Sequence, residues 1–119
     1  MSDYSISTTI TIPYPPSVNN YWKKWNNRIV ISKEGRQYKA DVADIGQKSS
    51  AKALAGPVAL IIKVWRPRKV GDLDNSLKAI LDALKGIAYQ DDKQVVEIHA
   101  FRADDKENPR AEVTYFECE

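Results

Sequence analysis

The spacing of apolar and polar residues along the chain predicts five β-strands. In residues 4–13 isoleucines alternate with hydroxyl-bearing side chains, which is typical of a strand buried on one face. A short second strand is predicted at 28–31. The run VALIIKVW at 58–65 is apolar on both faces, as in the centre of a sheet. Two further strands are predicted at 94–101 and 111–117.

Two other segments have the spacing of amphipathic helices. Ser32 is the expected N-cap of a helix that runs to about Ala53. A second helix is expected from about Leu73 to Lys85, where Gly86 ends it. The apolar faces of the two helices are formed by Tyr38, Val42, Ile45 and Ser49, and by Leu77, Ile80, Leu81 and Leu84.

The stretch between the first two strands has a different composition. Residues 13–28 contain three prolines and four asparagines, which predict a long ordered loop without regular structure. The resulting order, β-(β)-α-β-α-β-β, predicts an α/β (α+β) fold of two layers, with a mixed sheet and two main helices. At 119 residues, the chain is expected to form a single domain over residues 1–119.

Composition and charge narrow the functional classes. The 43% hydrophobic and 29% charged content is that of a folded globular chain. No apolar run reaches the roughly 18 to 20 residues of a membrane span, and we read no secretory signal at the N-terminus. Cys118 is the only cysteine, which excludes an internal disulfide and fits a reducing cytoplasm.

Basic and acidic residues are unevenly distributed along the chain. Residues 1–71 carry twelve Lys and Arg against four Asp and Glu, whereas residues 72–119 carry six against twelve.

Two pairs of carboxylates stand in the segment GDLDNSLKAILDALKGIAYQDDKQVV, residues 71–96. Asp72 and Asp74 come at the start of the second helix, and the pair Asp91 and Asp92 comes directly before the next strand. If that strand pairs beside 58–65, we expect both acidic groups at the same end of the sheet. Hard carboxylate oxygens without nearby Cys favour Mg²⁺ or Mn²⁺ over zinc. The alternative is that these acids only cap helices and occupy a solvated turn.

The same motifs resemble a known family. DLDNSLKAILDAL followed by DDKQVV is similar to the signature of the RusA-type Holliday junction resolvases, in which a lysine follows D-L-D-N on the helix and D-D-x-Q-V comes later. The segments PYPPSVNNYW and SKEGRQYK are also similar to the family's opening loop and first helix, so the resemblance covers nearly the whole chain. One departure is that Val70 and Gly71 precede Asp72, where known members carry a run of arginines.

The resemblance implies a homodimeric, Mg²⁺-dependent endonuclease of DNA recombination and repair that cuts four-way DNA junctions by paired symmetric nicks. It places the metal ligands at Asp72, Asp74 and Asp92, with Asp91 as a neighbour that supports or shares the site. The catalytic lysine of the pattern falls on Lys78. It also implies the cytoplasm of a bacterial cell, with the chain encoded by the bacterium or by a phage.

Basic and aromatic residues supply the expected DNA contacts. Lys23, Lys24 and Trp25 lie in the predicted loop, and Arg66, Arg68 and Lys69 precede the first aspartate. The alternative for Tyr21, Trp22 and Trp25 is that they anchor the loop to the core or form a dimer contact. Two other functions stay open: a structure-selective nuclease for other branched or single-stranded DNA, and a DNA-binding module without catalysis. His99 is expected to be a structural or exposed side chain.

Overall fold

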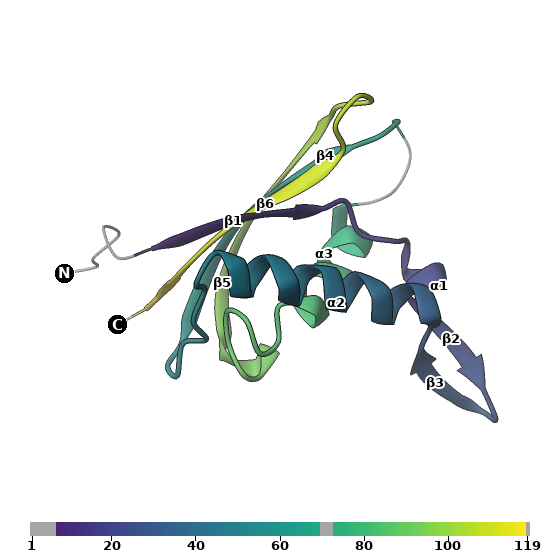
Figure 1. Cartoon of the computed structure of the whole chain (residues 1–119), viewed down its shortest axis with the longest axis horizontal. Coiled ribbons are helices and arrows are strands. Elements are labelled where there is room, and N and C mark those ends of the chain that lie inside the picture. The colour runs from purple at the N-terminus through teal and green to yellow at the C-terminus, as the bar shows by residue number, and fades with distance from the viewer. Residues whose placement is uncertain (1–6, 70–72, 119) are drawn as a thin grey trace.

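The computed structural model describes residues 7–69 and 73–118. A four-stranded sheet has the order β1-β6-β4-β5, and a two-stranded hairpin, β2-β3, stands apart from it. Figure 1 shows helix α2 lying along the sheet and the hairpin projecting beyond it. The elements are β1 (Thr8–Pro13), α1 (Val18–Tyr21), β2 (Trp22–Trp25), β3 (Arg28–Ile31), α2 (Lys33–Lys48), β4 (Val58–Arg66), α3 (Leu73–Ala83), the 3₁₀ turn η1 (Asp92–Gln94), β5 (Val95–Asp104) and β6 (Arg110–Glu117).

The sheet is mixed, as the sequence predicts. Strand β6 pairs antiparallel with both β1 and β4, whereas β5 pairs parallel with β4, so that His99 lies opposite Ile61. Strand β4 is central by its pairing, but only one face of it is covered by helices. Ile61 is 38% exposed and Lys63 is also exposed, whereas Leu60 and Ile62 are fully buried. The prediction of an apolar environment on both faces is therefore wrong.

The core lies between the sheet and the two longer helices. Val42 of α2 and Ile80 of α3 are completely buried against Ile10, Ile12 and the inward residues of β4. Ser32 caps α2 as predicted, because its hydroxyl accepts a hydrogen bond from the Gly35 amide at 2.9 Å. The helix ends at Lys48, five residues earlier than predicted. Ser49 is its C-cap, and Ser50 has a φ of 57°, which no helical residue adopts.

The segment predicted to lack regular structure contains both α1 and β2, so that prediction is wrong. Ser17 caps α1 by accepting a hydrogen bond from the Asn20 amide at 3.3 Å. Trp25 pairs with Arg28 across a turn formed by Asn26 and Asn27, whose φ angles are 50° and 60°. Two consecutive left-handed residues form the tight turn that matches the twist of a hairpin, and asparagine tolerates this conformation better than most residues.

Candidate active site

The predicted catalytic residues on α3 lie on its solvent side. Asp74 occupies the first turn of the helix, where the free backbone N–H groups favour a carboxylate, and it is exposed. Lys78 lies one turn later and is also exposed. Leu73 and Leu77 pack against the core and fix the orientation of the helix. Asp72, predicted as the third ligand with Asp74 and Asp92, lies outside the described residues.

The second acidic group lies in a tightly bonded turn before β5. Asp91 is the N-cap of η1, and its Oδ1 accepts a hydrogen bond from the Lys93 amide at 2.9 Å. That bond is the main cause that lowers the pKa of Asp91 below its usual value of 3.8. The Gln94 side chain accepts hydrogen bonds from the amides of Gln90 and Asp91, which completes a capping box. Asp92 has its side chain 49% exposed.

The expectation that both acidic groups lie at one end of the sheet is wrong. Strands β4 and β5 are parallel neighbours. The connection that contains α3 must therefore carry the chain back from the carboxyl end of β4 to the amino end of β5. Asp74 therefore follows the carboxyl end of β4, whereas Asp92 precedes the amino end of β5. Along α3 alone, eleven residues correspond to roughly 16 Å at 1.5 Å per residue. Within residues 7–69 and 73–118, no three His, Cys, Asp or Glu side chains are grouped so that they could hold a metal.

A network that the sequence analysis missed surrounds the end of α3. Asp82 accepts a hydrogen bond from the buried hydroxyl of Tyr21, with 2.7 Å between Oη and Oδ2. The ammonium groups of Lys39 and Lys85 each lie 3.6 Å from its carboxylate. Lys85 also lies 3.7 Å from Oδ2 of Asp92. Asp82 therefore links the end of α1 to α2 and α3, and Lys85 extends the network to Asp92. In the sequence Asp82 is marked only by its place beside Leu81 in the apolar stripe of the helix.

The basic residues after β4 differ in their surroundings. Arg66 is 9% exposed, and its Nε lies 2.7 Å from Oδ1 of Asp104. This ion pair joins the carboxyl ends of the parallel strands β4 and β5, which favours a structural role for Arg66. It also holds the pKa of Asp104 below its usual value. Arg68 and Lys69 are exposed in the connection that leads towards α3.

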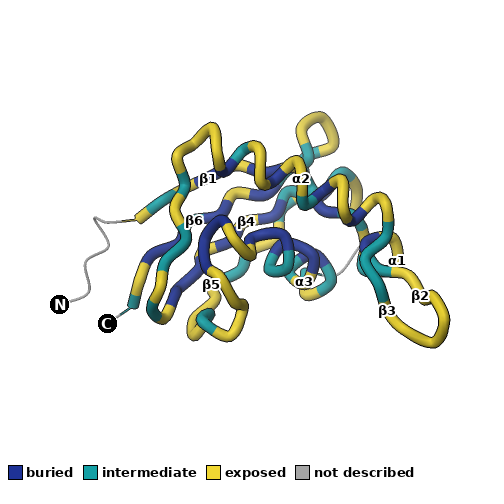
Figure 2. The backbone as a smooth tube through the Cα atoms, turned by 60° about the horizontal axis from the view of Figure 1, so that its bottom comes forward, coloured by how far each residue is buried: buried dark blue, intermediate teal, exposed yellow. Residues whose placement is uncertain are grey.

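The hairpin β2–β3 exposes cations beside apolar side chains. Trp25 is 54% exposed and Ile29 is 74% exposed, and the tip of the hairpin is open to solvent in Figure 2. Lys23 and Lys24 are exposed on the same hairpin, and the Arg28 guanidinium lies 6.0 Å from the centroid of the Trp25 ring. In contrast, Tyr21 is fully buried and Trp22 packs against the core. Tyr21 and Trp22 therefore anchor the base of the hairpin to the core, whereas Trp25 faces solvent.

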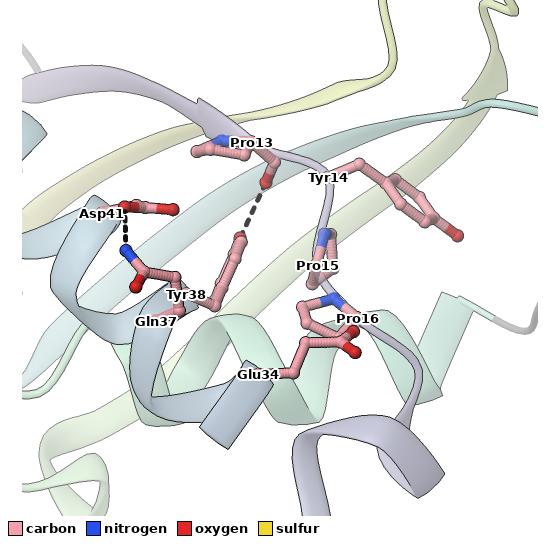
Figure 3. Close-up of a pocket in the computed structure, with 8 residues that line it drawn as sticks. All are labelled: Pro13, Tyr14, Pro15, Pro16, Glu34, Gln37, Tyr38 and Asp41. Carbon is pink, nitrogen blue, oxygen red and sulfur yellow. Dashed lines mark hydrogen bonds between the residues drawn. The ribbon is translucent and has the colours of Figure 1, made fainter. Parts of the chain in front are cut away.

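Another hollow on the surface contains none of the predicted site residues. A pocket of about 290 Å³ separates the proline segment at 13–16 from the start of α2 (Figure 3). The hydroxyl of Tyr38 donates a hydrogen bond to the Pro13 carbonyl at 2.7 Å, and Gln37 donates one to Asp41 at 2.9 Å. The Tyr38 bond fastens the proline segment to α2, whereas the Gln37 bond joins successive turns within the helix.

Comparison with known proteins identifies the family. The family model described as endodeoxyribonuclease RusA matches residues 13–115. The crossover junction endodeoxyribonuclease RusA of Escherichia coli strain K12 is 38% identical over 98% of this chain and 97% of its own length. The enzymes of the same name from Enterobacteria phages 82 and HK97 are 40% and 35% identical, over 91% and 76% of this chain and 92% and 78% of their own. The expected family is thereby confirmed: the chain belongs to the RusA family of endodeoxyribonucleases.

Proposed function

We propose that this protein is a metal-dependent endodeoxyribonuclease that cuts four-way DNA junctions by paired nicks. The observation that carries the proposal is the pair Asp74 and Lys78, exposed on consecutive turns of α3 in a member of this family. The relatives from E. coli and from phages are named as crossover junction endodeoxyribonucleases, which supplies the substrate. These sources also support a bacterial cytoplasm. No helix in the described part of the chain is long and apolar enough to cross a membrane.

The proposed ligands fit a hard divalent cation by their chemistry. Asp74 and Asp92 are exposed carboxylates, and Mg²⁺ or Mn²⁺ prefers such oxygen donors. A cation held by Asp72, Asp74 and Asp92 would supply charge stabilisation at the scissile phosphate and a more acidic bound water. Lys78 would neutralise the charge that builds on the phosphate and the leaving oxygen. Asp91 already uses one carboxylate oxygen to cap η1, which supports a structural role for it beside Asp92.

The separation of Asp74 from Asp92 supports a homodimer with shared sites. A two-fold axis perpendicular to the strands would reverse their direction in the second copy, so that its Asp92 could approach Asp74 of the first copy. Strand β5 is suited to this contact because it is an edge of the sheet and none of its residues is fully buried. Val96 and Phe101 on it are 63% and 55% exposed. Two such sites would match the two equivalent strands of a four-way junction.

Mixing two inactive chains tests the shared site. D74N and D92N homodimers should both lack cleavage, but a mixed dimer would have one site with both substitutions and one intact site. We therefore expect the mixture to make single nicks in the junction. If each site lies within one chain, no intact site can form, and the mixture will be as inactive as its components.

Exposed cations provide the proposed DNA surface. Lys23, Lys24 and Trp25 on the hairpin, with Arg68 and Lys69 near the start of α3, are available to phosphates and to unpaired bases. Phosphate contacts carry no sequence information, so discrimination of junctions would come from shape and from Trp25. The substitution W25A should weaken binding of a four-way junction more than binding of a linear duplex, whereas K24A should weaken both. If W25A weakens binding of the junction and of the duplex equally, Trp25 plays no part in recognising the junction.

Cleavage of a labelled four-way junction tests the function directly. With Mg²⁺ or Mn²⁺ the protein should make opposed nicks, EDTA should abolish them, and D74N should reduce the rate by at least about 100-fold, since each 1.4 kcal/mol of lost stabilisation is tenfold. Glu34→Gln is the matched control, because Glu34 is the first-turn acid of α2. Equal cleavage of three-way, single-stranded and four-way DNA would identify a broader nuclease. Tight junction binding without cleavage under any metal would identify a binding module.

A further inference from the structure

Gln94 belongs to the D-D-x-Q-V motif, yet none of the proposed chemistry uses it. Its side-chain amide makes four hydrogen bonds. Oε1 accepts from the amides of Gln90 and Asp91 at 2.9 and 3.0 Å. Nε2 donates to the carbonyl oxygens of Leu54 and Gly56 at 2.7 and 2.9 Å. Both polar atoms of this half-buried side chain are therefore fully engaged with backbone.

These four bonds join two segments that are distant in the sequence. The acceptor side of the amide holds the turn at 90–91, directly before Asp92. The donor side holds residues 54–56, which lead into the central strand β4. The turn is thus tied to the segment that leads into β4, and this tie restrains the backbone beside Asp92.

The carboxylate of Asp92 has a separate support. Lys85 Nζ lies 3.7 Å from its Oδ2 and 3.6 Å from Oδ1 of Asp82. Because the Asp92 side chain is half exposed, this ion pair contributes little alone. Backbone bonds therefore do most to place the carboxylate, and those made by the Gln94 side chain act beside the bond from the Leu54 amide to the Ala88 carbonyl at 2.9 Å.

We propose that Gln94 is a positioning residue for Asp92. It touches neither DNA nor metal, and it acts by holding the acidic turn in the conformation that presents the carboxylate. The shape of the site explains the residue type. Glutamate has no donor for the carbonyls of Leu54 and Gly56, and asparagine is one methylene shorter. The inference rests on the proposed function, because it assigns a purpose to the placement of Asp92.

Substitution of Gln94 gives two independent readouts. In Q94A the amides of residues 90–93 should exchange with deuterium faster than in the wild type, without any metal or DNA present. The Mg²⁺ concentration at half-maximal cleavage should rise, or the cleavage rate at saturation fall, by about 10- to 100-fold, as is typical for residues that orient metal ligands. Junction binding in EDTA, where we expect no cleavage, should stay within about twofold, because Gln94 is not among the proposed DNA contacts. Gln47→Ala, on the exposed side of α2, is the matched control.

A second variant keeps the test decisive if Q94A does not fold. Q94E has the same size and retains an oxygen that faces the amides of Gln90 and Asp91, but it loses the two donated bonds and sets its second oxygen against the carbonyls of Leu54 and Gly56. It should show the same two effects. Unchanged exchange at 90–93 in a folded variant, or faster exchange with unchanged metal dependence and rate, would overturn the proposal. D92N separates the two hypotheses. If D92N cleaves normally, the proposed site is wrong. If D92N is inactive while Q94A is normal, only the role of Gln94 is wrong.

Discussion

The hydrogen bond from Tyr21 to Asp82 should determine how firmly the hairpin is held. Tyr21 ends α1 directly before β2, and its ring is fully buried while its hydroxyl reaches α3. Burial and the neighbouring Asp82 carboxylate raise the pKa of Tyr21 far above its usual value, so the hydroxyl remains a donor at any working pH. The substitution Y21F removes this donor and keeps the aromatic ring.

The cost can be worked out from the partners that remain. A hydrogen bond to a charged group contributes about 1.5 to 3 kcal/mol. Asp82 keeps Lys39 and Lys85, each 3.6 Å away, so its carboxylate is not left unpaired and the low end of that range applies. For a chain of 119 residues the entropy of unfolding is about 0.25 kcal/mol per kelvin, so a loss of about 1.5 kcal/mol lowers Tm by about 6 °C.

Thermal unfolding of Y21F and of Y14F measures this difference. Tyr14 is a suitable control because its hydroxyl makes no hydrogen bond with the described residues and its ring is half buried. We expect Y14F to unfold within about 1 °C of the wild type. Faster amide exchange in β2 and β3 of Y21F should accompany the loss of stability. If Y21F is as stable as Y14F, the Asp82 network does not hold the hairpin and the reasoning is refuted.

Two further predictions concern packing and pH. In G35A the new Cβ would collide with the backbone carbonyl of Tyr21, so unfolding should be easier by about 1 to 3 kcal/mol. G46A should cost less, because its Cβ meets only a side chain, with Cγ2 of Ile87 at 2.8 Å, and no backbone atom. Denaturant titrations of both variants measure the difference, and equal losses would contradict the steric argument. Asp104 has its pKa lowered from 3.8 by Arg66, so its contribution to stability is present above about pH 4 and is lost as pH falls further. D104N should therefore be less stable than the wild type at pH 6, and it should lose less stability between pH 4 and 2. If the free energy of unfolding changes with pH in the same way in both proteins, Asp104 makes no such contribution.

Local rules of the sequence predict most of the secondary structure. The Ser32 cap, the start of the second helix at Leu73 and the strand at 28–31 follow from spacing and capping chemistry, and each is confirmed. The hairpin was missed because Asn26 and Asn27 were counted as loop formers, although two adjacent residues tolerant of positive φ also form a tight turn. The signal was present in the sequence but was given the wrong weight.

The arrangement of the candidate site depends on long-range geometry. Sequence adjacency suggested that Asp74 and Asp92 would meet, yet the parallel pairing of β4 and β5 places them at opposite ends of α3. Nothing local to either residue encodes strand direction. The network at Asp82 was missed for a similar reason, since Tyr21 lies sixty-one positions away in the chain. Pairs of this kind become visible only when the tertiary structure is known.

Because α3 separates the two acidic groups, the cutting rate should depend on protein concentration in a particular way. If each site requires carboxylates from two chains, the cutting rate below the Kd of the dimer rises with the square of the protein concentration. A cell that contains few copies would then hold mostly harmless single chains. A tenfold rise in protein concentration would then raise the cutting rate about 100-fold, which is a useful safeguard for an enzyme that cuts DNA.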